Sequence, residues 1–164
     1  MKFLEKTIRK ASQSKFWLRI LNTLLTKAIP FNRSLGVKII SISGLKVKVL
    51  LPYKKANKNH IGTIHACALA TAAELSSGLI VIQHAPPSTY RLILKNLSID
   101  YLYRANTDVI AVSEIEDEQV LKIPDNTDSK ELNLSSTLYN SEGNIVCKAK
   151  SLWQIKRWSE IAGT

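Results

Sequence analysis

The chain has 164 residues, of which 45% are apolar and 22% charged, so it is long enough for one domain with a buried core and has an ordinary globular composition. Its two cysteines, far apart in the sequence, exclude a disulfide framework and a cysteine zinc site, and we expect no metal. The net charge of +10 is uneven, because residues 1–60 hold 14 Lys or Arg against one acid, and such a basic half indicates an anionic partner.

The first 28 residues are predicted to form a basic amphipathic helix over residues 2–28, which ends before Pro30. We therefore divide the chain into an N-terminal helix, residues 1–29, and a single domain, residues 30–164. No cleavage site for a signal peptide follows the apolar run of this helix, and we expect a cytoplasmic protein. Packing of the helix on its own domain as a lid is favoured, and weak contact with an anionic membrane is the alternative.

Residues 35–43 and 45–51 are predicted to form a hairpin, and a basic loop follows it. After the hairpin comes the central stretch of the chain. From residue 61 to residue 83 there is no Lys, Arg or Asp, and Glu74 is the only formal charge. Apolar residues on all sides predict a helix over residues 63–82 that is buried all round. One sheet cannot cover it completely, so we expect a dimer with two sheets joined edge to edge.

The start of this helix is expected to be capped by Thr63. Its first free N–H groups, near Ala66 and Cys67, then form an anion or oxyanion site. The Cys67 side chain, among alanines, is predicted to fill the core. A lone carboxylate such as Glu74 is either a group hydrogen-bonded to backbone or Ser, or a catalytic base or nucleophile with a perturbed pKa.

Four more strands are predicted at residues 90–103, 108–115, 132–139 and 145–155, with an acidic loop at residues 114–128 and a turn at residues 140–143. Two strands, one buried helix and about four antiparallel strands predict an α+β fold in which a curved sheet wraps around a central helix. No internal repeat or domain linker interrupts this order.

A motif runs through the start of the central helix: Asn59-x-x-Gly62-Thr63-x-His65, two small residues, and an acid nine positions after the histidine. It resembles the hot-dog thioesterases of the phenylacetyl-CoA type, which read N-x-x-G-x-x-H-G-G followed by an Asp or Glu at the same offset. Ala-Cys in place of Gly-Gly, and Glu in place of Asp, are closer still to a hot-dog subfamily catalogued as a domain of unknown function. The resemblance covers residues 29–153 and implies a hot-dog fold.

The resemblance also implies an activity, the hydrolysis of an acyl-CoA or acyl-carrier thioester, by a homodimer or a dimer of dimers. No cofactor is implied other than the coenzyme A of the substrate. The implied site consists of catalytic Glu74, Asn59 and His65 and of oxyanion- or substrate-binding Gly62, Ala66 and Cys67. Basic side chains that could meet the phosphates of coenzyme A, or be solvated, are Lys54, Lys55, Lys58, Arg91, Lys95 and Arg104.

Other interpretations stay open. A non-catalytic acyl- or lipid-binding module would hold a fatty chain in the same pocket, and a Ser or Thr that assists some relatives is missing, near Leu94. Asn59 could be a left-handed turn residue and His65 a loop histidine with satisfied hydrogen bonds. Nucleic-acid binding is disfavoured, because the basic half lacks interleaved exposed aromatics and any reader motif.

Overall fold

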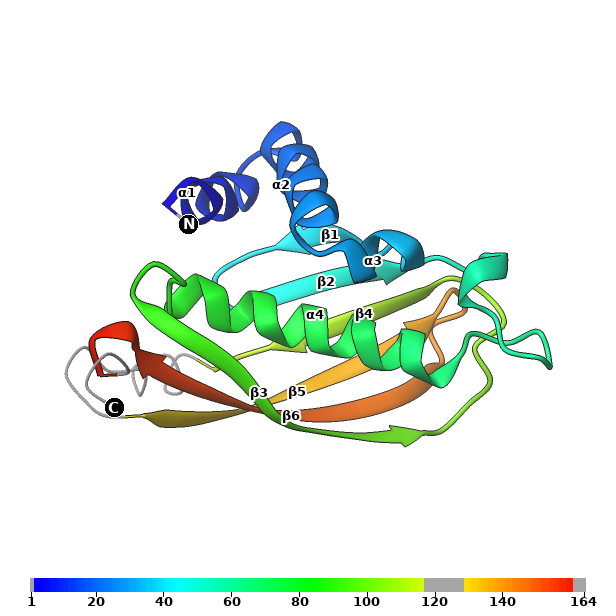
Figure 1. The fold of residues 1–164 in the computed structure, drawn as a ribbon. Helices are drawn as coiled ribbons and strands as arrows, with labels where there is room; N and C mark the ends of the chain where they lie inside the picture. Colours follow the sequence, from blue (N-terminus) through cyan, green and yellow to red (C-terminus); the bar gives the residue numbers. More distant parts are fainter. Residues whose placement is uncertain (1, 117–128, 161–164) are drawn as a thin grey trace.

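The computed structural model describes residues 2–116 and 129–160. One six-stranded antiparallel sheet curves around a long helix, α4, which spans Ala66–His84 (Figure 1). The sheet order is β1-β2-β4-β5-β6-β3. Its strands are β1 Lys38–Ile42, β2 Lys46–Leu51, β3 Tyr90–Tyr101, β4 Val109–Glu114, β5 Lys130–Asn140 and β6 Ile145–Arg157. The predicted α+β hot-dog fold is confirmed. Most of the acidic loop predicted at residues 114–128 lies outside the described residues.

The core lies between α4 and the concave face of the sheet. Strand β2 shows why: Val47, Val49 and Leu51 are fully buried and alternate with Lys48 and Leu50, which are half-buried. From α4, Leu79, Ile80 and Val81 are also almost completely buried. By length and composition alone α4 could also span a membrane, but half of its apolar window is buried inside the protein, as expected for a core helix.

The N-terminal segment is helical as predicted, but the single helix expected over residues 2–28 is wrong. Two helices replace it, α1 Lys2–Ala11 and α2 Lys15–Ala28, followed by a short third helix, α3 Pro30–Leu35. Ser14 adopts an extended backbone (φ −146°, ψ 125°), and the polar sequence Ser12-Gln13-Ser14 interrupts the apolar period. The break lets α1 fold back against α2 above the sheet (Figure 1).

The three N-terminal helices pack on the hot-dog core rather than standing apart from it. Ile8 and Leu21 are buried in the common core. The Glu5 carboxylate accepts a hydrogen bond of 2.9 Å from the Ser88 N–H, just after α4. From α2, Asn22 reaches the edge strand β1. These contacts hold the helices over one side of α4.

Candidate active site

The loop that leads into α4 is fixed by a buried asparagine and a tyrosine. Asn57, in the short 3-10 turn η1 (Lys55–Asn57), is fully buried, and its side-chain amide donates to the carbonyls of Leu35 and Pro52, each at 2.8 Å. The Asn57 carbonyl accepts from the His65 N–H at 2.7 Å. The Tyr53 hydroxyl donates to the Gly62 carbonyl at 2.6 Å. The loop is therefore anchored at Gly62 and at His65.

Asn59 organises this loop through its side chain. Its Oδ1 accepts from the N–H groups of Ile61 and Thr63, both at 3.1 Å, and its Nδ2 donates to the Thr63 hydroxyl at 2.9 Å. The left-handed conformation considered for Asn59 is wrong, because no non-glycine residue within 2–116 or 129–160 has a positive φ. Gly62 takes that conformation instead, at φ 80°, which glycine adopts without steric cost.

His65, not Thr63, is the N-cap of α4. The Thr63 hydroxyl is already held by Asn59, so the helix begins two residues later than that cap would place it. The His65 Nδ1 accepts a hydrogen bond of 3.1 Å from the Cys67 N–H. The N–H groups of Ala68 and Leu69 both donate to the His65 carbonyl. Among the first four N–H groups of α4, the Ala66 N–H is therefore the one without a partner in the described residues.

The prediction that Cys67 fills the core is wrong. Its side chain is exposed, like those of His65 and Ala66, and burial along α4 begins at Ala68. The alanine-rich stretch becomes core only where it meets the sheet. The other cysteine, Cys147, is fully buried in β6, and burial raises the pKa of its thiol to about 12.

A first cavity of about 350 Å³ lies at this end of α4, and we call it the entry pocket. It is lined by Asn59 and Ala66 from the motif, and by Tyr101 and Arg104 from the end of β3 and the segment after it. The Tyr101 hydroxyl donates to the Ala66 carbonyl at 3.2 Å. Desolvation, with smaller contributions from Cys147 and Cys67, raises the pKa of Tyr101, so this phenol is neutral at pH 7.

Glu74 lies in a second cavity of about 300 Å³, which we call the acyl pocket. Apolar side chains from α2, α3, α4, β3 and β6 form most of its wall: Leu25, Ile29, Phe31, Leu75, Leu79, Ile82, Leu92 and Trp153. The Glu74 carboxylate is half-buried, and no side chain or backbone group of the described chain pairs with it. Burial raises its pKa. For the interpretation of Glu74 as a hydrogen-bonded structural carboxylate, residues 2–116 and 129–160 therefore supply no partner.

The two cavities are separate in one chain. Glu74 follows Ala66 by eight positions on the same helix, and a rise of ~1.5 Å per residue places their backbones about 12 Å apart. The structure brings Asn59, Gly62, His65, Ala66 and Cys67 together at the helix start and leaves Glu74 two turns away. Within one chain, the acyl pocket and the entry pocket therefore share no lining residue.

Sequence reasoning missed Trp153 and Gly78, which form one wall of the acyl pocket. The Trp153 indole donates to the hydroxyls of Ser77 and Ser151, at 3.1 and 3.2 Å. A Cβ added at Gly78 would lie 3.0 Å from the Trp153 ring. A glycine inside an otherwise alanine-rich helix is the signal that could have indicated such a close contact.

The sequence profile of DUF4442, described as a domain of unknown function, matches residues 18–155. The chain belongs to the DUF4442 family. Solved structures show the same fold, and the three described below are each less than 25% identical to this DUF4442 chain. A protein of unknown function from Pseudomonas aeruginosa, described as a probable thioesterase, is 22% identical with a TM-score of 0.77, covering 85% of this chain and 95% of its own.

Two further structures carry the name thioesterase. One, a mutant thioesterase from Pseudomonas aeruginosa, is 16% identical with a TM-score of 0.71, covering 90% of this chain and 99% of its own. The other, from Haemophilus influenzae, is 14% identical with a TM-score of 0.67, covering 90% and 95%. No protein of curated function matches the DUF4442 chain significantly in sequence. Within its described residues, no group of three His, Cys, Asp or Glu side chains could hold a metal ion.

Proposed function

We propose that this DUF4442 protein hydrolyses an acyl thioester of coenzyme A or of an acyl carrier, with Glu74 as general base or nucleophile. One observation supports this most strongly. The Glu74 carboxylate, whose pKa is raised by burial, lacks a hydrogen-bond partner within the described chain and opens on an apolar cavity of about 300 Å³. Catalytic carboxylates occupy such environments, because water exclusion raises their basicity.

The proposed site is shared between two copies of the chain. The entry pocket of one copy receives the thioester carbonyl at the Ala66 N–H, with Asn59 orienting the carbonyl or the attacking water. Glu74 of the second copy takes a proton from water while the water oxygen attacks the thioester carbon. The C–S bond then breaks, and the leaving thiolate takes the proton from Glu74. The products are a carboxylic acid and a free thiol.

The acyl part of the substrate would occupy the acyl pocket. Its wall is mainly aliphatic and aromatic, which suits a hydrocarbon chain rather than a sugar or a charged acid. Leu25, Ile29 and Phe31 come from α2, α3 and the residue between them, so the N-terminal helices act as one wall of the pocket. This supports the lid role expected for that segment.

An acyl-binding module without turnover is the second candidate. One observation favours it: the Cys67 N–H, one of the two expected oxyanion donors, is occupied by His65. A single remaining N–H, at Ala66, would stabilise a tetrahedral intermediate less than a pair of donors. In this case the acyl pocket would hold a fatty chain, and Glu74 would stay unused.

The two candidates are separated by comparing the wild-type protein with Glu74→Gln on short, aryl and long acyl-CoAs. The glutamine keeps the shape of the side chain but cannot act as a base. Thioesterase activity predicts hydrolysis by the wild type and a loss of about 10²–10⁴-fold in the variant, with acyl-CoA binding retained. A wild type that binds acyl-CoA but hydrolyses none of the panel would establish the binding module instead.

A further inference from the structure

All three phenylalanines of the chain lie on the N-terminal helices, and all three are exposed. The exposed fractions are 60% for Phe3, 65% for Phe16 and 64% for Phe31. Phenylalanine is among the side chains most often found inside proteins, so a single exposed one would be ordinary but the whole set is not. Packing in the core of the protein therefore does not explain why phenylalanine stands at these three positions.

Each of the two longer helices combines its phenylalanine with basic side chains on one outward face. On α1, Lys6 follows Phe3 by three residues, and Lys10 comes four residues later. On α2, Arg19 follows Phe16 by three residues. The buried Ile8 of α1, and the buried Leu21 and Leu25 of α2, lie on the opposite faces of these helices. Packing on the domain therefore leaves an aromatic and basic face in solvent.

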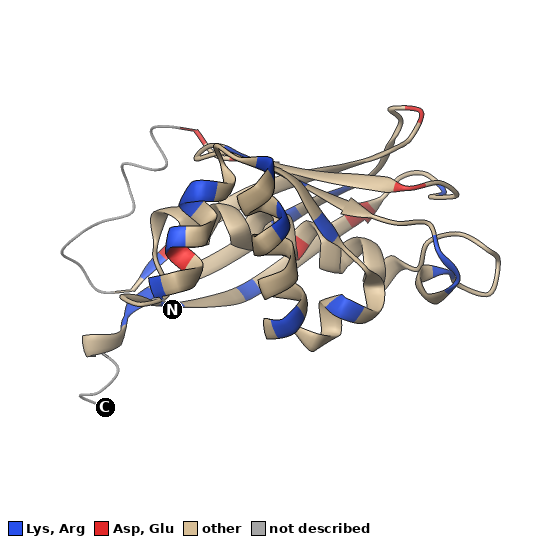
Figure 2. Cartoon of the chain, turned by 90° about the horizontal axis from the view of Figure 1, so that it is seen from above, with Lys and Arg blue, Asp and Glu red and all other residues tan. Residues whose placement is uncertain are grey.

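The positive charge of this segment is not neutralised locally. Residues 2–35 contain eight Lys or Arg and one acid, Glu5, whose carboxylate is engaged by the Ser88 N–H. Figure 2 shows Lys and Arg gathered on the N-terminal helices when the molecule is seen from above. Within residues 2–116 and 129–160, none of these eight side chains forms an ion pair.

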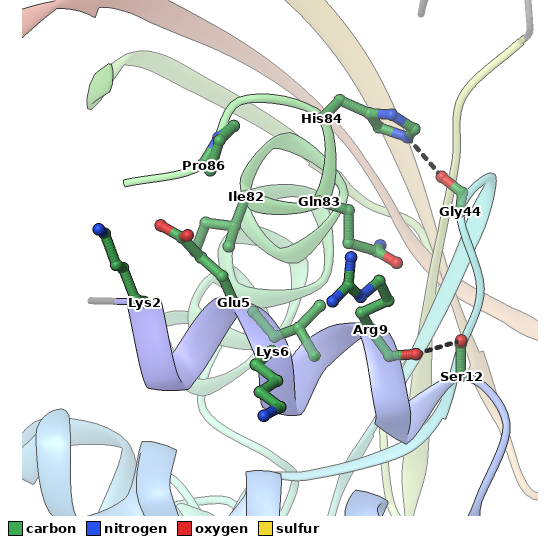
Figure 3. A pocket seen from close by; sticks show the side chains of 11 residues that line it. Lys2, Glu5, Lys6, Arg9, Ser12, Gly44, Ile82, Gln83, His84 and Pro86 are labelled. Atoms are coloured by element: carbon green, nitrogen blue, oxygen red, sulfur yellow. Dashed lines mark hydrogen bonds between the residues drawn. The ribbon is translucent and has the colours of Figure 1, made fainter. Parts of the chain in front are cut away.

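Two basic hollows flank the helices. The first, of about 460 Å³, lies between α1 and the end of α4, and the side chains of Lys2 and Arg9 extend toward it (Figure 3). The second, of about 610 Å³, is bordered by Arg19, Lys27 and Arg33, with no acidic residue in its wall. Both offer positive charge to groups that approach the helices from outside.

We propose that the outer helical face, formed by Phe3, Lys6, Lys10, Phe16 and Arg19, docks on a membrane surface rich in anionic phospholipids. The phenylalanines would insert among the acyl chains, while the basic side chains meet the lipid phosphates. The start of α2, the helix that carries Phe16, lies farthest from the sheet in Figure 1.

A bilayer fits this face better than an acidic protein does. The phenylalanines lie singly on separate helices, and a protein partner would need a matching pocket for each of them, whereas a bilayer accepts apolar side chains at any spacing. Phe31, the exposed phenylalanine outside this face, borders the acyl pocket instead. Membrane docking does not depend on hydrolysis, and it holds equally for a binding module.

Sedimentation of the full-length protein with vesicles tests this proposal. We expect binding to phosphatidylglycerol-containing vesicles that weakens at high salt, and little binding to pure phosphatidylcholine. The double variant Phe3→Ser/Phe16→Ser should bind about tenfold or more weakly, because it removes two inserting side chains. Ile145→Ser, which removes an exposed apolar side chain from the start of β6, should bind like the wild type.

A second pair of variants separates local charge from total charge. Lys6→Glu/Arg19→Glu should abolish the preference for anionic vesicles. Lys148→Glu/Lys150→Glu makes the same change in net charge on exposed residues of β6, and this variant should keep the preference for anionic vesicles. Melting curves confirm that each variant is folded. Absence of vesicle binding, equal binding to neutral vesicles, or equal losses in the two charge variants would overturn the proposal.

Discussion

Asn22 closes the outer edge of β1 through Ile39. Its Nδ2 donates to the Ile39 carbonyl at 2.9 Å, and its Oδ1 accepts from the Ile39 N–H at 2.7 Å. An amide side chain thus satisfies both backbone groups that an additional strand would use at this position. The opposite edge, the 12-residue strand β3, pairs only with β6 in the described chain. A long open edge is a template for pairing with another chain.

We therefore expect a homodimer in which β3 pairs with β3 of a second copy. Light scattering at micromolar concentration should give the mass of a dimer. Ser98→Glu, on the exposed side of β3, should weaken the dimer about tenfold or more, because symmetry places like charges close together. Ser41→Glu, at the edge that Asn22 covers, is the matched control and should stay dimeric. A monodisperse wild-type monomer would contradict both the assembly and the shared site.

Removal of the Asn22 amide should destabilise the fold. Asn22→Ala leaves the Ile39 N–H and carbonyl without their partner, and we expect a loss of about 1–3 kcal/mol in the free energy of unfolding. Denaturant titration measures this loss. Thr23→Ala is the control, because the exposed Thr23 hydroxyl donates to the Arg19 carbonyl within α2, and its loss should change stability little. Equal stability of the two variants would show that the edge bond is weak.

Local patterns predicted the elements of this fold well, since alternation defines β2 and an uninterrupted apolar run defines α4. They failed where tertiary contacts decide. Thr63 has the better side chain for capping, yet Asn59 already holds its hydroxyl, and His65 becomes the cap. Cys67 lies among alanines, but the sheet does not reach it. The roles assigned to Glu74, Asn59 and His65 stay predictions.

The acyl pocket also could not be predicted from local sequence, because its wall joins α2 and α3 to Trp153, which lies far away in the sequence.

Gly78→Ala tests whether the wall formed by Trp153 and Gly78 limits the length of the acyl chain that the pocket accepts. The added methyl would approach the Trp153 ring to about 3.0 Å, so the ring must shift or the pocket must narrow. We expect the kcat/KM for long acyl-CoAs to fall more than that for acetyl-CoA. Gly44→Ala, whose added methyl meets nothing within 4 Å, should leave the ratio unchanged.

Arg104 is the member of the six candidate phosphate ligands that lines the entry pocket. Lys95, by contrast, pairs with Glu131, and the Lys58 ammonium lies 3.6 Å from the centre of the Tyr53 ring. Arg104→Ala should raise the KM for an acyl-CoA about tenfold with little change in kcat, because phosphate binding contributes equally to ground and transition states. The KM for the same acyl group on N-acetylcysteamine, which lacks phosphates, should not change. A rise for both substrates would place Arg104 near the reacting carbonyl.

The raised pKa of Glu74 makes its effect on stability depend on pH. Burial favours the neutral carboxyl, so the folded protein holds the proton more tightly than the unfolded chain, whose carboxyl has an ordinary pKa of 4.5. The neutral carboxyl is compatible with folding below pH 4.5. As the pH rises through the folded pKa, Glu74 ionises in a partly apolar cavity, and the stability contributed by the neutral form is lost.

Glu74→Gln removes this ionisation and keeps the shape of the side chain. The variant should therefore melt at a higher temperature than the wild type at about pH 8, and the difference should shrink as the pH approaches about 4. Hydrolysis should show the opposite trend, because a general base must be ionised. The wild-type kcat should rise with pH through the same raised pKa of Glu74, whereas the residual kcat of the variant should not show this rise. Melting curves and rates collected on one set of buffers compare the two effects directly. A variant less stable than the wild type under the alkaline condition would mean that the ionised carboxylate is paired in the assembled protein, through a partner supplied by the second copy.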